Sequence, residues 1–161
     1  GAESEMCNYK IRNNKVTNII NNYLYDGAGL YTLGRFSSDG MNIISGNVLE
    51  GGHGYAGLYF DEMSNNYIAS NNLIGKGNKW FLLMHDINYG MKNITVTNNF
   101  VETNKKFINS YSHPSNEVEL EEIPLKERDI IVQNNYSRVN IHYKENADKI
   151  MQNSGSSSTF V

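Results

Sequence analysis

The sequence is poor in cysteine, and this shortage limits the stabilising devices that the chain can use. Cys7 is the single cysteine among 161 residues, so no disulfide can form within the chain. No CxxC pair and no cysteine-histidine spacing of the kind that binds zinc is present. We therefore expect neither a disulfide framework nor a structural zinc site.

Long apolar runs and clusters of positive charge are also lacking. No apolar run approaches the roughly 20 residues that a membrane-spanning helix needs. Lysine and arginine total 14 against 17 aspartate and glutamate residues, which gives a net charge of -3, and basic residues form only short pairs such as Lys105-Lys106. These features predict a soluble chain without a membrane span and argue against a nucleic-acid partner.

The length and the first residues give two expectations about the parent protein. A chain of 161 residues suits one domain with a continuous core. The start, Gly-Ala-Glu-Ser-Glu, has neither the basic start nor the apolar core of a signal peptide, and a leading glycine indicates a processed or truncated chain. We expect a C-terminal fragment of a larger protein.

Asparagine is abundant, and its positions are periodic. The chain has 25 asparagines and 14 glycines but only two prolines. A motif with apolar residues on both sides of an asparagine recurs five times. Aligned on one asparagine of each copy, the spacings are 25, 25, 27 and 36 residues, for Asn22, Asn47, Asn72, Asn99 and Asn135. Such regularity predicts a repeat architecture.

The repeats indicate short strands, because each one contains bursts of β-branched and aromatic residues separated by Gly, Asn, Ser and Asp. Several short strands per repeat must bend around and stack on the next repeat. We predict an all-β fold, a right-handed parallel β-helix of about four to five coils of roughly 25 residues. The repeated asparagines are then expected to stack at one turn as a hydrogen-bonded ladder, rather than to bind a ligand.

A second apolar element follows the first three motifs, at residues 29–34, 57–62 and 81–86. Side chains alternate between the two faces of a strand, so each element sends half of its side chains into the core. We expect the core-facing residues to be Leu30, Thr32, Leu58, Phe60, Leu82 and Met84. The outer face would then carry Tyr31, Leu33, Tyr59, Asp61, Leu83 and His85.

At these residues the sequence resembles right-handed β-helix proteins of the pectate-lyase-like superfamily, especially the carbohydrate-active ones. The resemblance is carried by residues 29–34 (GLYTLG), 55–64 (YAGLYFDEMS) and 84–86 (MHD) and covers roughly residues 15 to 102. Such proteins include glycoside hydrolases acting on xylosides and fucosides. The resemblance implies a polysaccharide or oligosaccharide substrate and a parent protein that is secreted or located at the cell surface or in the periplasm.

Glycoside hydrolysis needs two carboxyl groups on either side of the scissile bond. Equivalent positions in neighbouring coils lie about 4.8 Å apart, so Asp61 should have His85 beside it. His85 would orient Asp61 or tune its acidity. Asp86, Asp26 and Glu62 are alternatives for the second carboxyl, although Glu62 and Asp86 are also expected to face solvent as ordinary surface residues.

Three further side chains and two already named are candidates for substrate binding. Aromatic faces pack against the apolar faces of sugar rings, which favours Tyr31, Tyr59 and Trp80. Trp80 precedes an apolar run and is more typical of a core residue. His53 lies in a glycine-rich loop before the Asp61 strand, and Arg35 is a basic residue near the proposed face.

The later part of the chain departs from the repeat. Residues 1–150 are predicted to form one β-helix domain with a loop insertion near 102–128, and residues 151–161 have the composition of a linker. Residues 140–150 are a candidate cap for the open end of the solenoid. Calcium is an alternative at the acidic stretch 117–122, but alternating glutamates usually face water, so we expect no metal and no other cofactor.

Three function classes follow from these observations. The first is a glycoside hydrolase with Asp61 as a catalytic carboxylate. The second is a non-catalytic β-helix module that binds a glycan or forms a scaffold. The third, a polysaccharide lyase, ranks last because it needs a basic residue at the site, and only Arg35 and Lys79 are near the proposed face. Unpaired strand edges at the solenoid ends also allow a homo-oligomer.

Overall fold

A computed structural model describes residues 8–20, 24, 26–34, 40–52, 56–77, 80–87, 90–102, 106–113, 125–137 and 159–160. Within these residues the chain forms three parallel sheets and one short 3-10 helix, η1 (Leu125–Arg128). No helix in this part of the chain has the length and apolar character required to cross a membrane.

In each sheet, strands from successive coils are stacked in the order of the sequence. The first sheet contains β1 (Lys10–Arg12), β4 (Asn42–Ser45), β7 (Asn65–Ser70), β10 (Lys92–Thr97) and β13 (Ile130–Gln133). The second contains β2 (Lys15–Ile19), β5 (Val48–Gly52), β8 (Leu73–Ile74), β11 (Phe100–Val101), β14 (Tyr136–Ser137) and β15 (Thr159–Phe160). The third contains β3 (Ala28–Thr32), β6 (Ala56–Phe60), β9 (Trp80–Ile87) and β12 (Lys106–His113).

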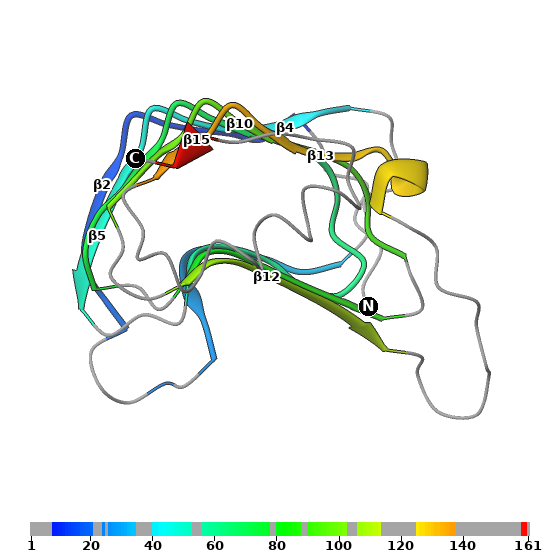
Figure 1. Ribbon diagram of the computed structural model, residues 1–161, viewed down its shortest axis with the longest axis horizontal. Helices are drawn as coiled ribbons and strands as arrows, with labels where there is room; N and C mark the ends of the chain where they lie inside the picture. Colours follow the sequence, from blue (N-terminus) through cyan, green and yellow to red (C-terminus); the bar gives the residue numbers. More distant parts are fainter. Residues whose placement is uncertain are drawn as a thin grey trace.

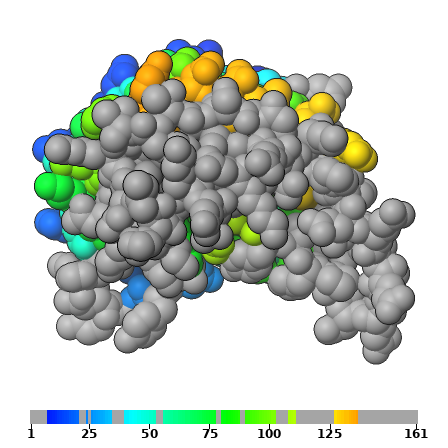
Figure 2. Space-filling view, viewed as in Figure 1, coloured from blue at the N-terminus to red at the C-terminus, as the bar shows by residue number. Residues whose placement is uncertain are grey.

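The path of the chain is that of a parallel β-helix, as the repeat predicted. Viewed along the solenoid axis, each of the first four coils passes through the first, second and third sheets in turn (Figure 1). The chain runs counter-clockwise while successive coils approach the viewer, and the orange C-terminal residues lie in front of the blue ones at the top of Figure 2. This is a right-handed coil, the hand expected for crossovers between parallel strands.

The interior between the sheets is filled by apolar side chains that stack in register. Leu30, Leu58 and Leu82 are aligned across three coils, and Thr32, Phe60 and Met84 are aligned beside them. The leucines and Met84 belong to the main core, as predicted, and Leu58, Phe60, Leu82 and Met84 are at most 1% exposed. Burial of these side chains is the main favourable term in folding such a coil.

The third sheet bends near the start of β6 and β9. Phe81 and Leu82 both lie in the main core, whereas Trp80 belongs to a second cluster with Ala56, Tyr59 and Leu83. Two consecutive inward residues break the alternation of a flat strand. Gly57 lies at this bend, where an added Cβ would come within 2.6 Å of Ile74 Cγ2. The close approach of the two sheets therefore requires glycine at this position.

The second cluster corrects the expected exterior of this sheet. Tyr59 and Leu83 point away from the main core, but they are 2% and 0% exposed rather than solvent-facing. Trp80 is buried at 4% exposed, in agreement with the core interpretation. The alternating pattern predicts correctly that Tyr59 and Leu83 point away from the main core, but it carries no information about what covers an outer face.

A ladder of asparagines fixes the turn between the first and second sheets. The backbone N–H of Asn47 donates to Oδ1 of Asn72 at 3.0 Å, and the Asn72 N–H donates to Asn99 in the same way, also at 3.0 Å. Each side-chain amide also donates to a main-chain carbonyl, as Asn72 Nδ2 does to Ile44 O at 3.1 Å. The ladder asparagines Asn47, Asn72, Asn99 and Asn135 are nearly fully buried. Their structural role is confirmed.

The first member of the ladder is Asn14, and the prediction of Asn22 is wrong. Asn14 donates from both its backbone N–H and its Nδ2 to Asn47 Oδ1, each at 3.0 Å. Asn22 lies outside the described residues. The first coil is longer than 25 residues, so an alignment on constant spacing selected a later asparagine.

The residue before each ladder asparagine has a left-handed backbone, which explains the Asn-Asn pairs of the sequence. The φ angles are 57° at Asn13, 67° at Gly46, 56° at Asn71, 55° at Asn98 and 53° at Asn134. Asparagine tolerates this conformation better than other residues with a side chain. In each pair the first residue therefore makes the turn, and the second makes the ladder.

The expected insertion near 102–128 needs correction, because part of it is regular structure. Residues 106–113 form β12, which pairs in parallel with β9 from Lys106–Trp80 to His113–Ile87. The acidic stretch 117–122 and the candidate cap 140–150 lie outside the described residues. At the end of the linker-like segment, Thr159 and Phe160 pair with β14.

We predict that the Asn72→Ala variant loses about 2–4 kcal/mol of unfolding free energy, because it leaves several buried groups without partners. The N–H and Nδ2 of Asn47 would both lose their acceptor. Urea denaturation of the two proteins at neutral pH measures the difference.

The matched control is Asn14→Ala, at the exposed end of the same ladder. Asn14 donates hydrogen bonds to Asn47 and Arg12 from its side chain, but water can replace these partners at the surface. A smaller loss than in Asn72→Ala is expected. Equal losses in the two variants would contradict the ladder as the main stabilising feature of this turn.

Candidate functional site

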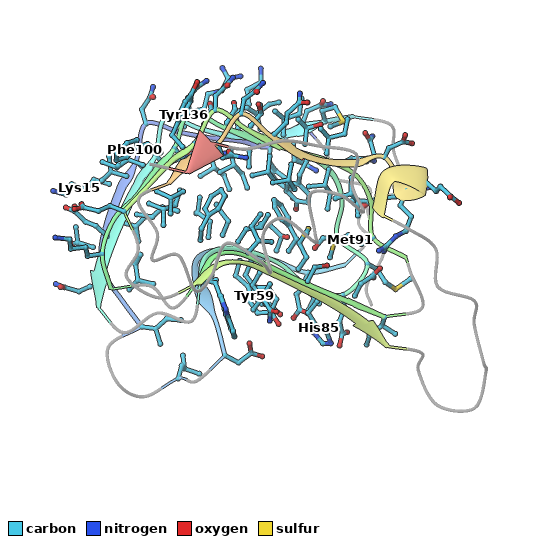
Figure 3. All side chains as sticks on the ribbon, in the orientation of Figure 1. Lys15, Tyr59, His85, Met91, Phe100 and Tyr136 are labelled. Atoms are coloured by element: carbon cyan, nitrogen blue, oxygen red, sulfur yellow. The ribbon has the colours of Figure 1, made fainter. Side chains whose placement is uncertain are left out.

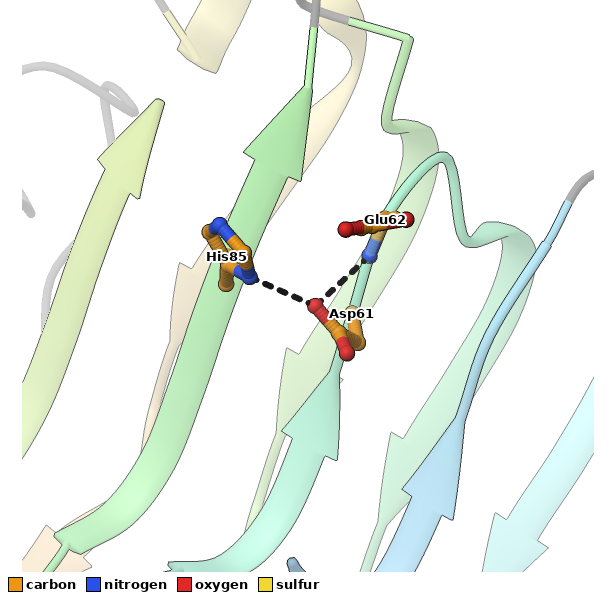
Figure 4. A group of neighbouring side chains, drawn as sticks. All are labelled: Asp61, Glu62 and His85. Atoms are coloured by element: carbon orange, nitrogen blue, oxygen red, sulfur yellow. Dashed lines mark hydrogen bonds and ion pairs between the residues drawn. The ribbon is translucent and has the colours of Figure 1, made fainter. Parts of the chain in front are cut away.

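The candidate site lies on the outer face of the third sheet, where β3, β6 and β9 end. Tyr31 is in register with Tyr59, and the next outward position is Asp61, directly after β6. The Asp61 N–H donates to Thr32 O at 2.9 Å, which continues the sheet pairing by one residue. His85 projects from β9 towards Asp61, and Glu62 follows Asp61 in the turn (Figure 4).

Asp61 is the centre of the site, since both oxygens of its carboxylate accept hydrogen bonds. Tyr31 donates its hydroxyl to Oδ2 at 2.5 Å. His85 Nδ1 lies 2.7 Å from Oδ1, and the Glu62 N–H donates to the same oxygen at 2.9 Å. The side chain of Asp61 is only 8% exposed. These contacts fix the carboxylate in one orientation between three coils.

The turn after Asp61 is held by Ser64. Its hydroxyl donates to the main-chain oxygen of Asp61 at 2.5 Å and lies 2.9 Å from Thr32 Oγ1. Met63 has a φ of 63°, and the Gly34 N–H donates to Glu62 O at 2.9 Å. The backbone of Asp61 and Glu62 is thereby connected to the neighbouring coil on the Tyr31 side.

The contact between Asp61 and His85 determines which histidine nitrogen is basic. An ionised carboxylate can only accept, so the 2.7 Å contact assigns the proton to Nδ1. Nε2 then carries the lone pair in the neutral ring. The His85 side chain is 17% exposed. This is the arrangement in which a carboxylate orients a histidine for proton transfer or ligand binding.

Tyr31 combines a buried hydroxyl contact with an exposed ring. The residue is 45% exposed, and its ring meets Tyr59 edge-to-face with a centroid distance of 5.0 Å. Burial raises the pKa of Tyr31 well above its ordinary value, and the hydrogen bond to Asp61 raises it further. The negative charges of Asp61, Asp26 and Glu62 act in the same direction. The phenol is therefore a persistent hydrogen-bond donor.

Of the predicted catalytic residues, the structure brings Asp61, Glu62 and His85 together but separates Asp86 from them. The Asp86 carboxylate pairs with Arg128 Nη1 at 2.5 Å and accepts from the Met91 N–H with both oxygens at 3.1 Å. Asp86 is 2% exposed, so the expectation that it faces solvent is wrong. It follows His85 on the strand and therefore faces the opposite side, where Met91 lies (Figure 3).

The candidate substrate-binding residues have different positions. Tyr31 is exposed beside Asp61, whereas Tyr59 and Trp80 are buried in the second cluster. His53 and Arg35 lie outside the described residues, as does Lys79. Asp26 is exposed and close enough for its charge to act on Tyr31. Of these three aromatic residues, only Tyr31 therefore has a ring that a ligand can reach.

The sequence did not reveal that the hydroxyl of Tyr31 binds Asp61. The aromatic face of Tyr31 predicts a role in binding, whereas its hydroxyl reaches diagonally across the strand pair to Asp61. Long side chains can reach a diagonal neighbour on the same face of a sheet. The register of Tyr31 with Tyr59 makes Asp61 such a neighbour, so the repeat alignment could have predicted this contact. The repeat alignment could not have predicted that Ser64 holds the turn.

Three residues of the candidate site could together bind a metal cation. Asp61, Glu62 and His85 each offer one ligand atom, and these atoms lie within 4.8 Å of one another. A histidine with two carboxylates is a donor set that zinc accepts. Tyr31, His85 and the Glu62 N–H already satisfy the Asp61 oxygens, so these groups hold the carboxylate in place by hydrogen bonds alone.

Comparison of the chain with protein-family models, with curated proteins and with solved structures gave no match.

We predict that Asp61→Asn lowers the pKa of Tyr31 towards its ordinary value. The substitution removes the negative charge beside the phenol, while the burial that contributes most to the raised pKa remains. A titration of tyrosine Cζ resonances by 13C NMR measures the change. Asp129→Asn is the control, because Asp129 is exposed with a φ of 54°, which asparagine tolerates. An unchanged Tyr31 pKa in Asp61→Asn would contradict the contact.

The raised pKa of Tyr31 also fixes the sign of a stability change at high pH. Above about pH 10 the unfolded state loses the Tyr31 proton, while the folded state keeps it. The unfolded state then binds fewer protons, so this contribution to stability is present below pH 10 and falls as the pH rises. The Asp61→Asn variant should show a smaller fall over that range.

Proposed function

We propose that this protein is a carbohydrate-active β-helix protein of the pectate-lyase-like kind, with a glycoside hydrolase site on the outer face of the third sheet. The observation that carries the proposal is the group formed by Asp61, Glu62 and His85 beside the exposed ring of Tyr31. The substrate would be a polysaccharide or oligosaccharide. A parent protein with this activity would work outside the cytoplasm, where such polymers are found.

Asp61 and Glu62 suit different steps of the reaction. Asp61 is fixed by Tyr31 and His85 and would attack the anomeric carbon as the bond to the leaving group breaks. Glu62 is half-buried and nearer to solvent, so it would donate a proton to the oxygen of the leaving group. Water, deprotonated by Glu62, would then release the sugar from Asp61. His85 would keep Asp61 oriented. Tyr31 would donate to Asp61 and offer its ring to the sugar.

A non-catalytic glycan-binding module is the second candidate. The hydrogen bonds of Asp61 favour this candidate. Its carboxylate accepts three hydrogen bonds and its side chain is only 8% exposed, so it has little access to a substrate. In this case Asp61 would serve to orient Tyr31 and His85 towards a bound sugar. A polysaccharide lyase has less support, since it depends on Arg35 or Lys79, which lie outside the described residues.

We predict that Asp61→Asn and Glu62→Gln each lower the rate of glycan cleavage by roughly 10²-fold or more, because each removes a carboxyl group that the reaction requires. Release of reducing ends from a panel of plant and host glycans measures the rate. Asp129→Asn, which makes the same change in the exposed turn before β13, should keep the full rate.

The outcomes separate the candidate functions. Cleavage that depends on both carboxyls supports the hydrolase. Binding without cleavage by the unmodified chain would favour the non-catalytic module. An unsaturated product that absorbs ultraviolet light would indicate a lyase instead.

We further predict that cleavage retains the anomeric configuration. The ligand atoms of Asp61 and Glu62 lie no more than 4.8 Å apart, which is below the roughly 6.5 Å or more that inverting enzymes need to place a water between their carboxyl groups. Proton NMR of the first product formed from a defined oligosaccharide distinguishes the two anomers. Formation of the inverted anomer would rule out this pairing of carboxyls.

A further inference from the structure

The outer face of the second sheet carries a row of exposed apolar side chains, one from each of three coils. Leu73, Phe100 and Tyr136 are in register on β8, β11 and β14. They are 37%, 52% and 48% exposed, and we call them the apolar ladder. Figure 3 shows Phe100 and Tyr136 pointing away from the interior. Neighbouring coils are about 4.8 Å apart, so the ladder is a narrow strip parallel to the solenoid axis.

A second row runs beside the ladder and contains two carboxylates separated by a glycine. The Gly75 N–H donates to Leu49 O, and the Glu102 N–H donates to Ile74 O, so Glu50, Gly75 and Glu102 occupy equivalent positions. A Cβ at Gly75 would come within 2.8 Å of Glu50 Cβ. Glycine therefore leaves a gap between the two glutamates, which are two coils or about 9.6 Å apart.

This gap is part of an open groove with a volume of about 380 Å³. Leu73 of the apolar ladder forms one side of the groove, and the rest is lined by Thr17, Asn18, Glu50, Gly51, Gly75, Lys76 and Glu102. Lys15 pairs with Glu50 at 2.8 Å, and Lys76 pairs with Glu102 at 3.3 Å. Each carboxylate thus has a lysine beside it, and the four side chains together carry no net charge.

We propose that the groove and the apolar ladder form a second carbohydrate site, which binds an uncharged glycan chain lying along the solenoid axis. The substrate class rests on the proposed function, but the site is separate from Asp61 and lies on a different sheet. It would hold a polymer on the solenoid while the Asp61 site acts on it.

The chemistry of the lining favours an uncharged glycan over other occupants. Sugar hydroxyls can donate to Glu50 and Glu102, both of which have side chains 40% exposed. The C–H faces of sugar rings pack on aromatic and aliphatic side chains such as Phe100 and Leu73. A polymer of uronates is negatively charged, and Glu50 and Glu102 would repel it because the groove has no excess positive charge. A protein partner needs a wider apolar centre than one residue per coil.

The test is a titration of the full chain with xylohexaose, cellohexaose and hexagalacturonate, followed through backbone amide shifts by NMR. Binding of at least one uncharged hexasaccharide is expected to shift the amides of Gly51, Gly75 and Lys76. Leu73→Ala and Glu102→Gln should each weaken this binding about tenfold. Ile131→Ala is the matched control, because Ile131 is 37% exposed, as Leu73 is, but lies on the first sheet. It should bind as the unmodified chain does.

The location of the shifts separates this site from the Asp61 site. Shifts confined to Tyr31, Asp61 and His85 would overturn the groove as a binding site and leave the proposed function standing. Groove shifts in a chain that releases no reducing ends would support the groove and refute the hydrolase.

Three further results would overturn the second site. These are preferential binding of hexagalacturonate, absence of shifts with all three probes, and equal weakening by Ile131→Ala. Line broadening at Phe100 and Tyr136 that grows with protein concentration alone would indicate self-association through the ladder instead.

Discussion

The contact between equivalent positions of neighbouring coils is the constraint on which the rest of this structure depends. Parallel pairing within each sheet sets the spacing of the coils, and the asparagine ladder prevents one coil from sliding against the next. Each ladder amide satisfies main-chain groups that would otherwise be buried without a partner. The apolar core can stack leucine on leucine only because the register is held in this way.

The same stacking creates the candidate site, because it places residues from distant parts of the sequence side by side. Tyr31 and His85 are 30 and 24 residues from Asp61, yet both contact its carboxylate. No single strand or loop holds the group together. The orientation of Asp61 depends on three coils being in register, so a change in the core beneath these strands would also alter the chemistry on the outer face.

Periodicity predicted the architecture and the facing of the third sheet well. Leu30, Leu58 and Leu82 face the core, and His85 lies beside Asp61, as the repeat required. It did not predict that Tyr59 and Leu83 are buried on the outer face. The alternation of side chains shows which face of a strand a residue is on, but not whether other residues cover that face. The role of Asp86 was missed since its partner, Arg128, is 42 residues away in a coil of irregular length. Asn14 was missed for a similar reason.

The ladder also has a direction, since each asparagine donates to the one in the following coil. An additional coil that carries the Asn-Asn pair could therefore be inserted between two existing coils, because every ladder asparagine would still donate to an asparagine in the following coil. Gene duplication of a single coil would lengthen the solenoid by one step of about 4.8 Å. Insertion of a partial coil would break the series. Proteins of this kind are therefore expected to vary in length by whole coils.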